Sequence, residues 1–133
     1  MIQISRATID DIVAHARESV PGECCGLLLG QGAAIVRSVR AGNIAADPTR
    51  RFEIDPRDHI AARRDARGRG LAVLGFYHSH PRSAAEPSPT DLAEASYPDH
   101  LYLIVSLARG APDLGLFRLH SGNFQATAFV TVG

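Results

Sequence analysis

The sequence contains polar residues whose types and spacing suit metal-dependent hydrolysis. His78 and His80 stand two positions apart at the end of an apolar run, and Asp91 follows eleven residues after His80. Side chains at positions i and i+2 of a strand share one face, so both imidazoles can point at a single ion. Two imidazoles and one carboxylate are the protein ligands typical of a catalytic zinc site, whose fourth ligand is a water.

A metal-bound water also needs a base that takes and returns its proton. Glu23 is the best candidate for this base. It follows Pro21-Gly22 and directly precedes the apolar run from Cys24 to Leu29, so we expect it at the mouth of a buried strand. Partial desolvation there would raise the pKa of its carboxyl group toward a value useful for proton transfer.

The order and spacing of these residues resemble the signature of the JAMM/MPN metallopeptidases. That signature is a Glu far upstream, then His-Ser-His, seven residues, Ser, two residues and Asp. Here it reads Glu23, His78-Ser79-His80, residues 81–87, Ser88 and Asp91, with no departure from the pattern. The motif covers residues 23–91, about half of the chain, and the letters ECCGLL from Glu23 onward are also similar to small bacterial members.

The resemblance implies a fold, a cofactor and an activity. The fold would be a three-layer α/β/α sandwich with a mixed central sheet, similar to the cytidine deaminases. One Zn²⁺ per chain would be bound by His78, His80 and Asp91. Glu23 would act as general base and acid, and Ser88 would help to hold the oxyanion. The reaction would be hydrolysis of a peptide or isopeptide bond, at the C-terminal Gly-Gly tail of a ubiquitin-like protein.

The length of the chain bears on the partner that the resemblance implies. Members of the family that select poly-ubiquitin linkages carry inserted segments around the site, and 133 residues leave little room for them. This favours small prokaryotic relatives that act on sulfur-carrier proteins of ubiquitin-like fold.

Several residues also have a purely structural interpretation. Ser88 before Pro89, with Asp91 three positions later, is a capping-box pattern at a helix start, and such a cap would fix where Asp91 points. An isolated His-x-His at a strand end or a lone Glu such as Glu23 is often only a solvated polar group. Cys24 and Cys25 face opposite ways on a strand, and we take both as small core residues.

Other functions fit the sequence less well. A catalytically silent MPN scaffold that mediates protein contacts typically lacks one or more ligands, whereas this chain keeps all of them. A zinc deaminase would need a Pro-Cys-x-x-Cys pair and a His-x-Glu, and neither occurs. A thiol peptidase using Cys24 or Cys25 would keep its activity in a chelator.

The elements that position these residues alternate along the chain. The patterning predicts one mixed α/β domain over residues 1–133, with roughly eight strands and three helices around a central sheet. The predicted strands are 2–4, 24–29, 33–39, 52–54, 71–77, 101–107, 115–119 and 124–132. The predicted helices are 8–19, 55–67 and a third that begins near Ser88. Pro81 ends the strand that carries the histidines.

Composition limits the partners. The 14 Lys+Arg and 14 Asp+Glu balance to a formal net charge of zero, which gives no bulk attraction to nucleic acid or to an anionic membrane. No apolar run approaches the ~18 residues of a membrane span, and the N-terminus lacks a secretory signal pattern. We therefore expect a cytoplasmic protein, and the exposed edges of a small sheet are compatible with a homodimer.

Overall fold

The longest apolar runs of the sequence form the centre of the sheet. In the computed structural model, which describes residues 1–133, β2 (Cys25–Gln31), β4 (Ala72–His80) and β5 (Leu101–Ser106) lie side by side. All six residues of β5 and the first six of β2 are buried. Strands covered on both faces carry apolar residues at nearly every position, which explains these unbroken runs.

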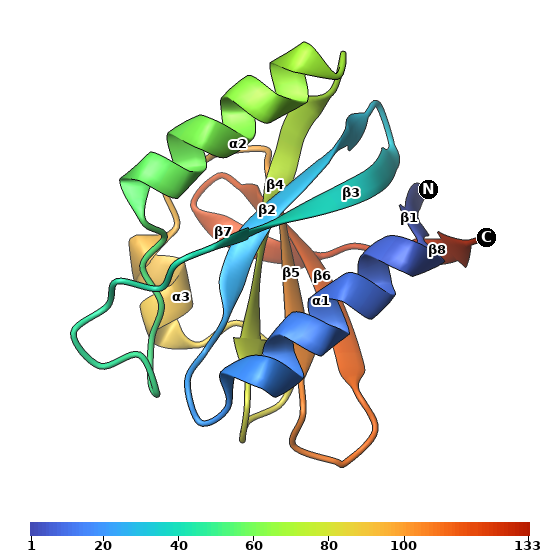
Figure 1. The fold of residues 1–133 in the computed structure, drawn as a ribbon. Coiled ribbons are helices and arrows are strands. Elements are labelled where there is room, and N and C mark those ends of the chain that lie inside the picture. Colours follow the sequence, from blue (N-terminus) through green and yellow to red (C-terminus); the bar gives the residue numbers. More distant parts are fainter.

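The remaining strands complete one mixed sheet of eight strands. Its order is β7-β6-β5-β4-β2-β3-β1-β8. The β4–β5, β1–β3 and β1–β8 pairs are parallel and the other pairs are antiparallel. Figure 1 shows that the sheet is strongly curled. The outer strands are β1 (Ile2–Ser5), β3 (Ala34–Ala41), β6 (Asp113–His120), β7 (Asn123–Ala126) and β8 (Phe129–Val132).

Two longer helices cover the sheet, and a third, short helix stands near its end. α1 (Arg6–Ser19) packs with a hydrophobic cluster that includes Leu103, whereas α2 (Pro56–Gly68) packs with a second cluster that includes Leu27. α3 (Pro89–Glu94) buries no residue. None of the three helices has the length and hydrophobicity needed to span a bilayer.

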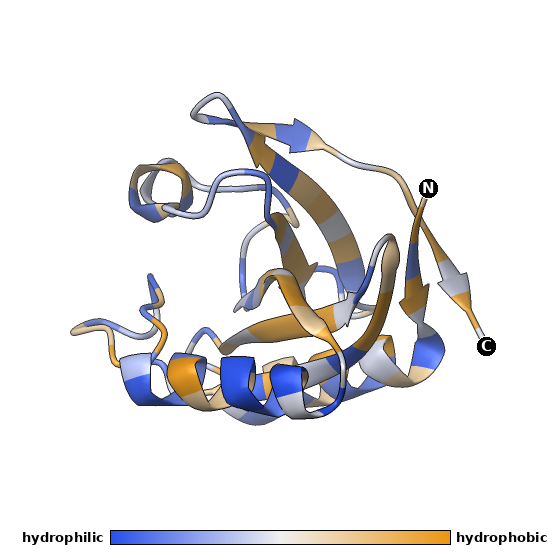
Figure 2. Ribbon diagram, turned by 90° about the horizontal axis from the view of Figure 1, so that it is seen from above, coloured by the Kyte–Doolittle hydropathy of each residue, from blue (hydrophilic) through white to orange (hydrophobic).

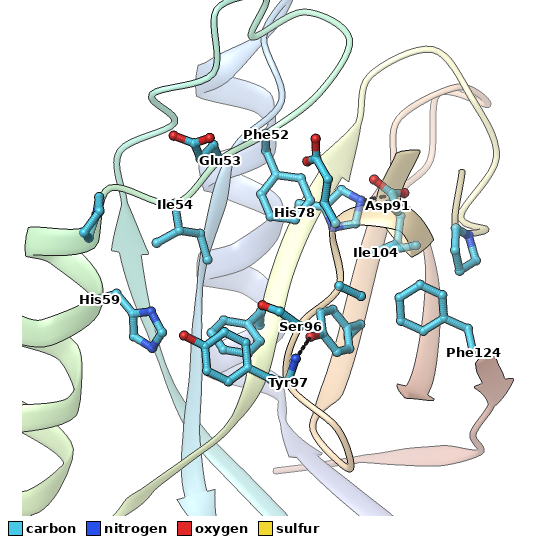
Figure 3. A pocket seen from close by; sticks show the side chains of 16 residues that line it. Phe52, Glu53, Ile54, His59, His78, Asp91, Ser96, Tyr97, Ile104 and Phe124 are labelled. Atoms are coloured by element: carbon cyan, nitrogen blue, oxygen red, sulfur yellow. Dashed lines mark hydrogen bonds and ion pairs between the residues drawn. The ribbon is translucent and has the colours of Figure 1, made fainter. Parts of the chain in front are cut away.

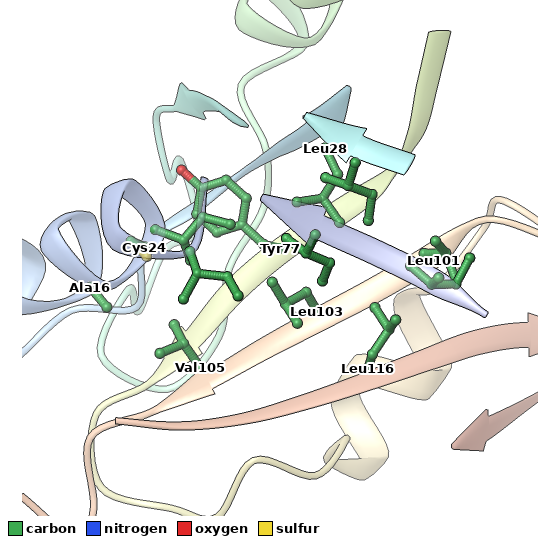
Figure 4. Close-up of a cluster of buried hydrophobic side chains, with 13 residues drawn as sticks. Ala16, Cys24, Leu28, Tyr77, Leu101, Leu103, Val105 and Leu116 are labelled. Carbon is green, nitrogen blue, oxygen red and sulfur yellow. The ribbon is translucent and has the colours of Figure 1, made fainter. Parts of the chain in front are cut away.

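The main core lies between α1 and the inner strands. Figure 4 shows Tyr77, Leu103 and Val105 at its centre, and all three are almost fully buried. The Tyr77 hydroxyl reaches the edge of this core, where it hydrogen-bonds to His15 Nδ1 at 2.7 Å. In Figure 2 the inner strands are mostly hydrophobic, and the helices mix hydrophobic with hydrophilic residues.

Two sequence-based expectations about strands were wrong. The segment 52–54 is not a strand, because only Ile54 forms an isolated bridge, with Asn43. The predicted strand 124–132 is divided into β7 and β8, which lie at opposite edges of the sheet. No Gly or Pro marks the division at residues 127–128, and Phe129 and Val130 follow it as they would in a continuing strand, so local pattern did not reveal it.

The core packing predicts a large loss of stability for Leu103→Ala. This side chain is fully buried, so its truncation should lower the free energy of unfolding by about 2–5 kcal/mol. Urea denaturation followed by circular dichroism measures this change. The control is Val36→Ala on β3, whose side chain is 50% exposed and should cost less than about 1 kcal/mol. Equal losses for the two variants would contradict the packing described here.

Candidate metal centre

The end of β4 brings two imidazoles together. His78 and His80 are 2% and 4% exposed, and their Nε2 atoms lie 3.1 Å apart. The strand stops at His80 because Pro81 has no N–H with which to continue the ladder. The expectation that both rings share one face at a strand end is therefore confirmed.

The start of α3 adds a carboxylate to this pair. Asp91 Oδ2 lies 3.1 Å from Nε2 of His78 and 3.1 Å from Nε2 of His80. The side chain is aimed by the predicted capping box: Ser88 N–H donates to Asp91 Oδ2 at 2.9 Å, and Asp91 N–H donates to Ser88 Oγ at 3.0 Å. Three ligand-type atoms thus form a triangle with equal edges.

The hydrogen bond at the far side of His80 indicates what fits inside this triangle. His80 Nδ1 lies 2.8 Å from the Ala84 carbonyl oxygen, which can only accept, so Nδ1 carries a proton. In the neutral ring, Nε2 then turns a lone pair toward the Asp91 carboxylate. Two such groups repel each other unless a proton or a metal ion lies between them, and a carbonyl that accepts from the far ring nitrogen is typical of metal-bound histidine.

The size of the triangle also suits zinc. Ligand atoms at about 2.0–2.1 Å from one tetrahedral ion lie roughly 3.3 Å from one another. The observed edges of 3.1 Å are close to this value. Two imidazole nitrogens and a carboxylate oxygen are also a donor set that zinc accepts readily, so the residues present fit the ion.

The electrostatics of the site favour positive charge beside Asp91. Burial would raise the pKa of Asp91, but its hydrogen bonds with His78 and His80 outweigh burial and hold this pKa well below its usual range. Desolvation lowers the pKa of the fully enclosed His78. Desolvation opposes protonation of His80, but its hydrogen bonds with Asp91 and with the Ala84 carbonyl outweigh this effect and raise its pKa. A metal ion would take the place of that proton beside the ionised carboxylate.

Glu23 lies beside the same rings. It precedes β2, is 8% exposed, and has a carboxylate oxygen within 4.8 Å of ring nitrogens of His78 and His80. Its Oε1 is buried without a hydrogen-bond partner. Burial raises the pKa of the carboxyl group to about 7, and the nearby His80 only partly opposes this shift. The expected position of Glu23 at a strand mouth is confirmed, and its burial there acts on the pKa in the expected direction.

A cavity of about 510 Å³ opens next to His78 and Asp91 (Figure 3). This volume lies in the range of small-ligand and peptide sites. Phe52 covers one side, where its ring stacks on His78 with centroids 4.2 Å apart. The other aromatic side chains in its lining are Phe76, Tyr97, Tyr102 and Phe124.

Sequence reasoning missed this cavity. Its aromatic residues come from the segment before α2, from β4, from the segment after α3, and from β5 and β7. No spacing along the chain connects them, so only the tertiary structure reveals that they share one wall.

Ser79 and the two cysteines lie away from the triangle. Ser79 Oγ accepts a hydrogen bond from the Cys24 N–H at 2.8 Å and so joins the end of β4 to the residue after Glu23. Cys24 and Cys25 are buried in different hydrophobic clusters. Burial raises the pKa of Cys24 to about 11 and that of Cys25 to about 12, so neither thiol is a nucleophile at neutral pH.

Both cysteines should therefore resist alkylation in the folded protein. We expect intact-mass analysis to find almost no carbamidomethyl adduct after iodoacetamide treatment at neutral pH, and two adducts per chain after treatment in urea. Rapid labelling of one thiol in the folded state would contradict this expectation and would support a thiol peptidase instead.

Comparison with known sequences identifies relatives over most of the chain. The family described as prokaryotic homologs of the JAB domain matches residues 5–120. A desampylase from Haloferax volcanii is 41% identical over 105 residues, which cover 73% of this chain and 74% of the relative. A probable TtuB-protein conjugate cleaving protease from Thermus thermophilus is 30% identical over 97 residues, covering 73% of this chain and 65% of the relative.

Solved structures agree with this assignment. A solution structure of a protein from Desulfitobacterium hafniense superposes with a TM-score of 0.89 at 33% identity, covering 99% of this chain and 93% of that chain. A JAB1/MPN domain protein from Archaeoglobus fulgidus has a TM-score of 0.66 at 18% identity, covering 100% and 98%, which shows a shared fold. The chain belongs to the prokaryotic JAB/MPN (JAMM) family of metallopeptidases.

Proposed function

We propose that this chain is a zinc peptidase that cleaves after the C-terminal Gly-Gly tail of a ubiquitin-like or sulfur-carrier protein. The observation that carries the proposal is the convergence of His78, His80 and Asp91 at mutual distances of 3.1 Å, with Glu23 beside them. The name of the Thermus thermophilus relative, which denotes cleavage of protein conjugates, supports this class of substrate. The bond cleaved would be a peptide or an isopeptide bond.

The two carboxylates have different roles in this proposal. Asp91 is the third ligand of one Zn²⁺ per chain, because its Oδ2 lies 3.1 Å from both imidazole nitrogens and is held by Ser88 N–H. Glu23 is the base, because its Oε1 has no partner and its pKa of about 7 suits a group that both takes and gives a proton.

Zinc, Glu23 and Ser88 would each contribute to a different step of the hydrolysis. When bound, zinc polarises the scissile carbonyl and lowers the pKa of a water to about 7. Glu23 takes the proton of the attacking water and delivers it to the leaving amine. Ser88 Oγ accepts from the Asp91 N–H, so its own hydroxyl proton remains free to stabilise the oxyanion. Capping and catalysis by Ser88 are therefore compatible.

The proposal also includes the layer arrangement of the fold, the oligomeric state, the class of partner and the cellular location. α1 and α2 pack against separate hydrophobic clusters, which supports a three-layer sandwich similar to the cytidine deaminases. The free edges of β7 and β8 at the two ends of the sheet are compatible with a homodimer. Zero net charge gives no support for a nucleic-acid partner, and the predicted location is the cytoplasm.

Zinc stoichiometry tests the roles of the two carboxylates. Asp91→Asn should lose most of the bound zinc after dialysis, because it removes the anionic ligand, whereas Glu23→Gln should keep about one zinc per chain. Elemental analysis by mass spectrometry measures both. If Asp91→Asn retained zinc and Glu23→Gln lost it, Glu23 would be the metal ligand and Asp91 the base, which would contradict the proposal.

Intact-mass analysis of a sulfur carrier with a C-terminal extension after Gly-Gly tests the activity. The zinc-loaded protein should release the extension. Chelator should abolish the reaction, and Glu23→Gln should slow it by at least about 100-fold because proton transfer is lost. An unchanged carrier in the presence of a zinc-loaded chain would favour the silent scaffold. Full activity in a chelator would exclude a metallopeptidase.

A further inference from the structure

The side chain of Glu23 lacks a hydrogen bond that would orient its carboxyl group. Its Oε1 is buried without a hydrogen-bond partner. The residue also stands outside the sheet ladder, because β2 begins only at Cys25. The direction of the carboxyl group therefore depends on how the main chain of Glu23 is held.

The segment between β3 and α2 holds this main chain on both sides. The Glu23 N–H donates to the Pro48 carbonyl at 2.7 Å. The Glu23 carbonyl accepts from Asn43 Nδ2 at 2.9 Å. Both partners come from residues 42–55, a stretch without helix or strand.

The Asn43 side chain fixes that segment as well. Its Nδ2 donates to the Arg51 carbonyl at 3.1 Å, and its Oδ1 accepts from the N–H groups of Ala45 and Glu53, both at 3.0 Å. A primary amide has two donors and an oxygen that accepts two bonds, so every hydrogen-bonding position of Asn43 is used. The Asn43 side chain thus links Glu23, which precedes β2, to main-chain groups near the start and near the end of the segment.

The same segment covers the metal centre. Phe52 stands between Arg51 and Glu53, whose main-chain groups Asn43 binds, and its ring stacks on His78 (Figure 3). Asn43 therefore fixes the position of Glu23, the proposed base, relative to Phe52, which covers His78. It does so through hydrogen bonds to main-chain groups alone.

We propose that Asn43 is a positioning residue that holds Glu23 in its productive orientation. The proposal rests on the proposed function for the role of Glu23 as base. Without the amide, the Glu23 carbonyl loses its partner from the segment, and the carboxyl group moves relative to the imidazoles. A displacement of about 1 Å at a reacting group can lower the rate by about 100-fold, whereas substrate binding elsewhere is unaffected.

Two substitutions distinguish the effect of losing the donor group of Asn43 from the effect of losing its whole side chain. Asn43→Asp keeps the shape and the two accepted bonds, but it turns an oxygen toward the carbonyls of Glu23 and Arg51. Asn43→Ala removes all four bonds without adding charge. The matched control is Asn123→Asp on β7, an exposed residue whose Nδ2 donates only to Ser121 O at 3.5 Å.

Steady-state kinetics on the carrier with a C-terminal extension should split kcat from KM. Both Asn43 variants should lower kcat by about 10- to 100-fold, with KM within about twofold of the unsubstituted chain, and they should keep their zinc. Asn123→Asp should be unchanged in all three quantities. An unchanged kcat in Asn43→Asp and Asn43→Ala would overturn the proposal.

A double-mutant cycle shows whether Asn43 acts through Glu23. In the Glu23→Gln background, Asn43→Ala should lower the residual rate by less than about twofold, because the group it positions is already lost. The same 10- to 100-fold factor in both backgrounds would mean that Asn43 acts by another route, and this would overturn the proposal.

Amide exchange supplies a readout that does not need the substrate. In nuclear magnetic resonance spectra, the Glu23 N–H should exchange about fivefold to tenfold faster in Asn43→Ala, since the segment that carries Pro48 loses its anchor. Unchanged exchange would overturn the proposal even in an active enzyme. If the unsubstituted chain cleaved no carrier, the proposed function would be refuted. Faster exchange of the Glu23 N–H in Asn43→Ala would still show that Asn43 fixes the main chain of Glu23.

Discussion

The contact of Asp91 with His78 and His80 is the constraint on which the rest of the site depends. The three facing atoms lie 3.1 Å apart, and the Ala84 carbonyl requires a proton on the far nitrogen of His80. This arrangement is favourable only with positive charge between the rings and the carboxylate. The fold brings the three groups together by ending β4 where the first turn of α3 returns to it.

The same contact helps to hold α3 on the molecule. This six-residue helix adds no residue to the hydrophobic core, and the side chain that it does enclose is that of Asp91. Its attachments are polar: the capping box of Ser88 and Asp91, the imidazoles, and an ion pair between Glu94 and Arg51. Arg51 belongs to the segment that Asn43 also binds. The candidate metal centre, α3 and the segment before α2 are therefore connected by polar contacts at this end of the sheet.

The sequence predicted those parts of the site that depend on local pattern. The i, i+2 spacing of His78 and His80, the capping box and the burial of Glu23 each follow from neighbours in the chain, and each is present. The aromatic cavity could not be predicted, because its wall is assembled from distant segments. Asn43 was missed for the same reason, since a lone Asn after a strand normally indicates only a turn. The division between β7 and β8 was not predicted, because no Gly or Pro stands between them.

The two carboxyl groups near the imidazoles lie in environments that shift their pKa values in opposite directions. Asp91 receives hydrogen bonds from Ser88 N–H and from both rings, and these contacts lower its pKa despite burial. Glu23 is buried with no partner for Oε1, and desolvation raises its pKa to about 7. Titratable groups whose environments drive their pKa values apart are suited to separate tasks. A permanently ionised carboxylate suits a cation, and a carboxyl that titrates near neutrality suits proton transfer. The division of labour that we propose for Asp91 and Glu23 thus follows from the hydrogen bonds that the first carboxyl group has and the second lacks. The Glu23 main chain, in turn, is bonded to the segment outside the sheet.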